Sequence, residues 1–96
     1  MNKPLIIEAE LLKQLVALPL AQKEACWEAI QAVPETFGRM HTHSGLSIRK
    51  IRPHLFECRA GLNLRLLFTD EADGVHLAFV GTHDQIQKEL RTGKYG

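Results

Sequence analysis

The spacing of apolar residues changes near residue 46, and this change limits the fold more than any other feature of the sequence. Before it, apolar side chains recur every three or four positions, as they do along one face of an α-helix. After it, they alternate with charged residues, which is the period of a half-buried β-strand. The chain is therefore expected to be α+β, with helices first and a sheet after them, in a single domain spanning residues 1–96.

Two helices are predicted in the first part of the chain. Residues 8–18 carry leucines at helical spacing, and Pro19 ends this helix because proline lacks the backbone N–H. A second helix is predicted over Ala21–Val33, with Pro34 as its end. Two helices joined by a short turn form an αα-hairpin. The preceding segment Leu5–Ile7 fits either a short first strand or the approach to the first helix.

Four strands and a short helix are predicted in the second part. Turns are expected at Pro53-His54, Ala60-Gly61 and Asp73-Gly74, and the last pair suits the positive φ angles of a tight hairpin. Three successive hairpins give an antiparallel sheet, and the αα-hairpin packs on one of its faces. The strands are Leu46–Arg52, Leu55–Arg59, Leu62–Phe68 and Val75–Val80, and the helix is His83–Arg91.

Alternation along the strands assigns side chains to the two faces of this sheet. Phe56 and Cys58 face the helices, and Arg59 points the other way together with Leu55 and Glu57. In the next strand, Arg65 lies on the face opposite the apolar one. Arg59 and Arg65 are therefore expected close together on the open face, where a bound polyanion would relieve their repulsion. The apolar face of that strand comprises Leu62, Leu64, Leu66 and Phe68.

The net charge of +1 conceals a strongly basic middle segment. Residues 39–65 carry six Lys and Arg against one Glu, whereas residues 1–38 and 66–96 each carry five acidic against three basic side chains. Clustered positive charge raises the local potential and favours an anionic partner, with a merely solvated basic face as the simpler alternative.

Several classes of protein are not expected from this sequence. No apolar run approaches the ~20 residues of a membrane-spanning helix, and no signal-peptide core is present, which predicts a cytoplasmic protein without membrane contact. Cys26 and Cys58 suit buried thiols better than a disulfide. His41 and His43 lack a third ligand at metal spacing, so neither a metal nor a cofactor is expected.

The order of the elements and three segments resemble the RelE/ParE toxin superfamily. The segments are GLSIRKI, LFECRAGLNLRLLF and VHLAFVGTHDQIQKEL, and the resemblance covers residues 5–91. The matching features are Gly45 with Arg49 and Lys50, Arg65 before Leu66-Leu67-Phe68, and Gly81 with His83. The resemblance implies a RelE-like fold and the toxin of a type II toxin–antitoxin system, with a cognate antitoxin covering its basic face.

The resemblance also implies an activity. RelE-type members are ribosome-dependent mRNA interferases, metal-independent endoribonucleases in which the 2′-hydroxyl attacks the neighbouring phosphate. By this resemblance, Arg59 and Arg65 stabilise the phosphate and the transition state, and His83 contacts phosphate or donates a proton. Glu57 is the candidate base, and mRNA on the ribosome is the substrate. The remaining RNA contacts expected on the basic segment are Arg49, Lys50 and Arg52.

Other functions stay open at this point. RelE-like nucleases often use a tyrosine in or after the last helix, where this chain has Glu89, and its only tyrosine is Tyr95. A ParE-like toxin that inhibits DNA gyrase without catalysis, or a catalytically inactive relative, is the alternative. Two residues also have structural alternatives: Arg65 as a cross-strand partner of Glu57, and His83 as a cap of the final helix.

Overall fold

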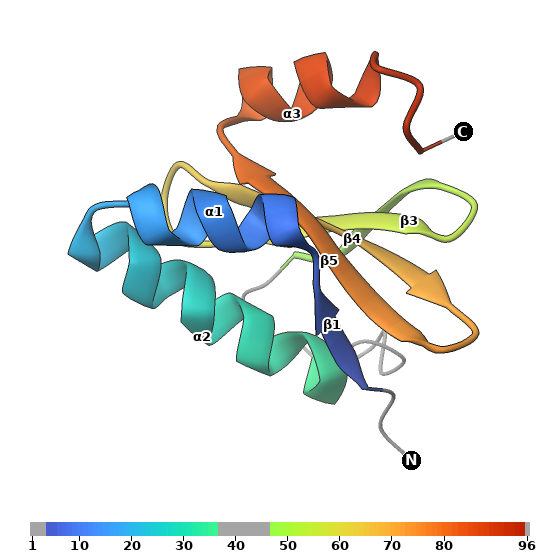
Figure 1. Cartoon of the computed structure of the whole chain (residues 1–96), viewed down its shortest axis with the longest axis horizontal. Coiled ribbons are helices and arrows are strands. Elements are labelled where there is room, and N and C mark those ends of the chain that lie inside the picture. Colours follow the sequence, from blue (N-terminus) through green and yellow to red (C-terminus); the bar gives the residue numbers. More distant parts are fainter. Residues whose placement is uncertain (1–3, 37–46, 96) are drawn as a thin grey trace.

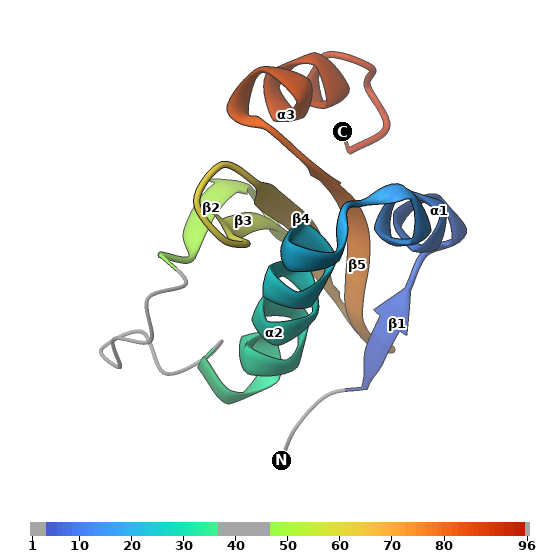
Figure 2. The ribbon, with the colours of Figure 1, turned by 90° about the vertical axis from the view of Figure 1, so that its left-hand side faces the viewer.

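A computed structural model describes residues 4–36 and 47–95, and within them two layers of helix enclose a five-stranded sheet (Figure 1). Helices α1 and α2 pack on one face of the sheet and α3 packs on the other (Figure 2). The elements in chain order are β1 (Leu5–Ile7), α1 (Ala9–Ala17), α2 (Leu20–Thr36), β2 (Arg49–Arg52), β3 (Leu55–Arg59), β4 (Arg65–Glu71), β5 (Gly74–Gly81) and α3 (His83–Leu90).

The strand order across the sheet is β1-β5-β4-β3-β2. Strands β2 to β5 form the predicted antiparallel meander. The segment Leu5–Ile7 is a strand, and it pairs parallel to β5, with Leu5 opposite Val75 and Ile7 opposite Leu77. The sheet is therefore mixed. None of the helices in the described part of the chain is long and apolar enough to cross a membrane.

The main core lies between the αα-hairpin and the sheet. Leu11 from α1 and Ile30 from α2 contact the sheet residues Leu66, Phe68 and Leu77, and all five are at most 1% exposed. Both cysteines are free and belong to this core, as predicted. Burial raises the pKa of the Cys26 thiol to about 11 and that of Cys58 to about 12, so both thiols are unreactive at neutral pH.

A smaller apolar cluster lies on the opposite face, beneath α3. Ile86 and Leu90 of α3 contact Leu55 of β3 and Leu67 of β4, and the four side chains are buried. The helix begins with a capping box, in which Thr82 Oγ1 accepts from the Gln85 N–H and Gln85 Oε1 accepts from the Thr82 N–H. The face of the sheet opposite the αα-hairpin is therefore only partly exposed, because α3 covers the rest of it.

Three predicted segments have an end that differs from the structure by more than one residue. Helix α2 continues through Pro34 to Thr36, because the missing hydrogen bond falls in the last turn and the adjacent Val33 is fully buried in the core. Leu62 is 99% exposed rather than on the apolar face, because residues 60–64 form a turn before β4 begins. That turn is closed by a hydrogen bond from Ala60 N to Leu64 O of 2.9 Å.

Gly61 at this turn has a φ of 87°, which favours glycine, and a Cβ there would make a tight contact of 3.0 Å with Ala25 of α2. The predicted strand Leu46–Arg52 begins at Arg49 in the structure. Leu46, Gly45 and the candidate metal ligands His41 and His43 lie outside the described residues.

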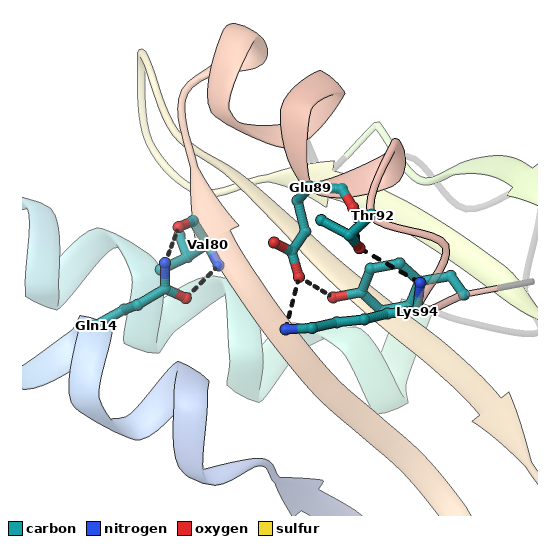
Figure 3. A network of polar contacts seen from close by, with 6 residues as sticks. Gln14, Val80, Glu89, Thr92 and Lys94 are labelled. Carbon is teal, nitrogen blue, oxygen red and sulfur yellow. Dashed lines mark hydrogen bonds and ion pairs between the residues drawn. The ribbon is translucent and has the colours of Figure 1, made fainter.

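The Gln14 side chain bonds the backbone of β5 beyond the point where β1 ends. Strand β1 ends at Ile7, so the backbone of Val80 further along β5 has no neighbouring strand on that side. The Gln14 side chain from α1 takes its place: Nε2 donates to Val80 O (2.8 Å) and Oε1 accepts from Val80 N (2.9 Å) (Figure 3). One amide thereby satisfies both backbone groups of a buried residue.

Replacing Gln14 with alanine is expected to lower the free energy of unfolding by about 2 kcal/mol, because two buried backbone groups lose their partners. Gln22→Ala is the matched control, since Gln22 is exposed on α2 and its loss should change stability by no more than about 0.5 kcal/mol. Urea unfolding followed by circular dichroism measures both. Equal effects of the two substitutions would contradict the proposed role of Gln14.

Candidate nucleic-acid interface

A pocket of about 250 Å³ lies at the end of the sheet where β3 ends and β4 begins. Three of the predicted site residues, Arg59, Arg65 and His83, line it. Arg59 and Arg65 are direct partners across β3 and β4, as predicted from the hairpin. On its other side Arg65 pairs with Gly81 of β5, and His83 follows two residues later. The strand register therefore brings His83 to the two arginines.

The lining of this pocket is basic and polar. Besides the three predicted residues it contains Asn63, Leu62 and Leu64, and no carboxylate is among these described lining residues. Two guanidiniums supply planar, multiple N–H donors, and such donors suit the oxygens of a phosphate. The His83 imidazole at the same pocket adds a ring whose nitrogens can donate or accept a hydrogen bond. The arrangement can bind an anion and move a proton beside it.

Asn63 was not singled out from the sequence. It lies in the turn between β3 and β4, and only the conformation of this turn places it in the pocket. The cap of α3 was missed as well, although the Thr82-x-x-Gln85 spacing is a recognisable capping box. Because Thr82 and Gln85 cap this helix, the His83 side chain does not do so, and its structural alternative is wrong.

Arg65 also forms the cross-strand pair that was its structural alternative. Its Nη1 lies 3.3 Å from Glu57 Oε1, and Arg49 Nη2 from β2 lies 2.8 Å from the same oxygen. Glu57 is only 1% exposed and does not line the pocket. Arg65 is 33% exposed, so its guanidinium contacts the buried carboxylate and still lines the pocket. The two roles are compatible.

The three residues predicted as further RNA contacts, Arg49, Lys50 and Arg52, do not line the pocket. Arg52 Nη2 donates to Leu90 O (3.1 Å), so its guanidinium holds the end of α3. Lys50 pairs with Phe56, whose side chain packs against the core under the αα-hairpin, which places Lys50 on the opposite face from Glu57. Arg49 is exposed and remains on the same face as Arg65.

Tyr95 lies away from the pocket. Its hydroxyl donates to Glu89 Oε2 (2.8 Å), and Lys94 Nζ lies 3.5 Å from the same oxygen (Figure 3). Burial, together with this bond to Glu89, raises the pKa of the Tyr95 hydroxyl well above its ordinary value. Tyr95 lines a different cavity, of about 550 Å³, with His54 and His76. It does not take the place of a tyrosine beside Arg59 and Arg65.

One group in the described part of the chain has the composition of a metal site. Ligand atoms of Glu71, Asp73 and His76 lie within 4.8 Å of one another at the β4–β5 turn. The hydrogen bond between Asp73 Oδ1 and His76 Nε2 (2.8 Å) raises the pKa of His76, with Glu8 contributing from the end of β1. His76 is therefore paired with Asp73, and Glu8 lies on the other side of its ring.

The fold is similar to that of solved toxin–antitoxin structures. A chain of the archaeal RelE–RelB complex from Pyrococcus horikoshii matches with a TM-score of 0.67 and 16% identity, covering 85% of this chain and 96% of that one. The RelB–RelE complex from Methanococcus jannaschii gives a TM-score of 0.64 at 17% identity, covering 88% and 98%. The E. coli DinJ–YafQ complex gives 0.66 at 10% identity, covering 90% and 98%.

The chain has the RelE-like fold. No protein-family model and no curated protein matches its sequence. The RelE-like fold expected from the sequence resemblance is thereby confirmed, including the αα-hairpin, the antiparallel strands and the short last helix.

Arg59→Ala and Arg65→Ala are each expected to weaken binding of a short single-stranded oligonucleotide, because each removes one guanidinium from the lining of the pocket. Each substitution should also reduce the slope of log affinity against log salt by about 0.7. Fluorescence anisotropy at several salt concentrations measures both quantities. Arg91→Ala, which removes an exposed arginine just beyond α3, is the control and should change neither. An equal loss in all three variants would show that binding depends on net charge alone.

Proposed function

We propose that this chain is the toxin of a type II toxin–antitoxin system and acts as a metal-independent endoribonuclease on mRNA at the ribosome. The observation that carries the proposal is the pocket in which Arg59, Arg65 and His83 meet without a carboxylate, on a RelE-like fold. RNA presents a phosphodiester beside a 2′-hydroxyl, and cleavage by that hydroxyl requires positive charge at the phosphate and a group that transfers protons.

The chemistry divides between the three side chains. Arg59 and Arg65 are paired residues of β3 and β4, and both line the pocket. Their guanidiniums supply charge-assisted hydrogen bonds to the non-bridging oxygens, which become more negative in the transition state. His83 is the imidazole that lines the pocket, and it donates a proton to the leaving 5′-oxygen, while the attacking 2′-hydroxyl loses its own proton to water. Glu57 is buried, bonded to two arginines and outside the pocket, which favours a role other than base.

A cognate antitoxin is the expected protein partner. The similar RelE, YafQ and YoeB structures were solved as complexes with RelB, DinJ and YefM. An acidic segment of such an antitoxin would complement the exposed guanidiniums of Arg49 and Arg59 and close the pocket to RNA. The protein is expected to act in the cytoplasm, where its ribosomal substrate is.

The position of Tyr95 supports two alternatives to a nuclease. RelE-like nucleases often place a tyrosine at the phosphate, whereas here the tyrosine is bonded to Glu89 away from the pocket. A RelE-like fold without that tyrosine also fits a ParE-like toxin that binds and inhibits DNA gyrase, or a catalytically inactive relative. Both alternatives keep the basic pocket as a binding surface but require no proton transfer by His83.

Induced expression in a bacterial host is expected to arrest growth and to cleave abundant transcripts within codons, as detected by primer extension. Arg65→Ala and His83→Asn should each reduce cleavage by about 100-fold or more, because each removes a transition-state interaction. Arg91→Ala should cleave as the wild type does. Arrest without cleavage, together with DNA damage and lost supercoiling, would instead support gyrase inhibition, and no arrest would support an inactive relative.

A further inference from the structure

Glu57 is the one charged side chain that is buried in the described part of the chain. It lies on β3, opposite Arg49 of β2 and Leu67 of β4, on the face that α3 covers. Its Oε1 accepts from both Arg49 and Arg65, whereas Oε2 is buried without a hydrogen-bond partner among the described residues. A buried carboxylate is unusual when one of its oxygens accepts two hydrogen bonds and the other accepts none.

The residues next to Glu57 on β3 and β4 are mostly apolar. Its neighbours along and across the strands, Leu55 and Leu67, pack in an apolar cluster with Ile86. Burying a carboxylate is unfavourable, and a well-packed apolar residue is often as stabilising or more so at such a position. Stability alone therefore does not account for Glu57. Its two bonds to arginines, one of which lines the basic pocket, point to a role in the site.

We propose that Glu57 is a positioning residue that holds the guanidinium of Arg65 at the pocket and ties Arg49 of the edge strand to the same point. This inference rests on the function proposed above and assigns Glu57 a part in it other than that of base. A guanidinium has five N–H donors, so one bond to Glu57 leaves the others of Arg65 available to a phosphate. The carboxylate thus limits the rotation of Arg65 without occupying its phosphate-binding edge.

A base role would require the carboxylate to reach the substrate's hydroxyl. Glu57 does not line the pocket, and the oxygen it shares with Arg49 and Arg65 is already bonded to both. The strand register explains why Glu57 lies between the two arginines. On one side, Arg49 of β2 is its direct cross-strand partner. On the other, its partner on β4 is Leu67, and Arg65 lies two residues before Leu67 on the same face. The three side chains therefore form a fixed cluster that spans β2, β3 and β4.

Glu57→Met and Glu57→Gln test the proposal, with Glu89→Gln as the matched control. Glu89 also accepts a hydrogen bond from a side chain, Tyr95, and forms an ion pair with Lys94, but both contacts lie away from the pocket. Methionine suits the apolar cluster, so Glu57→Met is expected to fold with a midpoint of urea unfolding at or above that of the wild type. This variant keeps the test valid if Glu57→Gln does not fold.

The first readout is the ¹⁵N NMR spectrum of the arginine side chains, which does not depend on cleavage. Arg65 should show separate, slowly rotating Nη signals in the wild type and in Glu89→Gln, and averaged signals in both Glu57 variants. Unchanged Arg65 signals in the Glu57 variants would overturn the proposal, whether or not the protein cleaves RNA. If the wild type does not cleave RNA, the proposed function fails, and this readout still decides the positioning role.

The second readout is single-turnover cleavage of mRNA on programmed ribosomes. Both Glu57 variants should lose about 100-fold in the maximal rate, as expected for a misplaced catalytic group, with KM unchanged or lower because a negative charge has been removed. The shape of the pH–rate profile should stay that of the wild type. Loss of its acidic limb in the Glu57 variants would show a base instead, and an unchanged maximal rate would also overturn the proposal.

Discussion

The pairing of β4 with β3 on one side and with β5 on the other is the constraint on which the candidate site depends. Arg65 at the start of β4 lies opposite Arg59 and opposite Gly81, so one register brings two arginines together and determines where the chain leaves the sheet. The capping box at Thr82 then begins α3 at once, which leaves His83 above the same strand ends. A shift of β4 by one residue would move Arg65 to the other face and remove the pocket.

Helix α3 divides the face of the sheet that the αα-hairpin leaves uncovered. Its apolar residues bury Leu55 and Leu67, and Arg52 holds its last turn. The strand ends at Arg59 and Arg65 remain outside this cover and stay accessible. In the described part of the chain, the basic segment is therefore not a uniform basic surface. Its side chains there bond the end of a helix, face the other side of the sheet, bond a buried carboxylate or line the pocket.

Local pattern was enough to predict much of the fold and part of the site. The change of period separated the helices from the strands, and the short connection between two strands placed Arg59 beside Arg65. The pairing of β1 with β5 joins residues 70 positions apart, for example Leu5 with Val75, and no local pattern reveals such a contact. Leu62 alternates correctly with Leu64 in the sequence, yet the turn needs five residues, which places Leu62 at its tip. The double pairing of Glu57 required the register of β2, which periodicity does not determine.

The assignment of the pocket as the nucleic-acid site is tested most directly by an NMR titration with a short RNA. The 2′-hydroxyl at its scissile position is replaced by hydrogen, so that the RNA binds without being cleaved. The largest shift changes are expected on the pocket residues Arg59, Asn63, Arg65 and His83, which lie at the end of β3, in the turn that follows it, at the start of β4 and at the start of α3, with little change on α1 and α2. Changes centred on the helices, or spread evenly over all exposed basic residues, would contradict the assignment of the pocket as the nucleic-acid site.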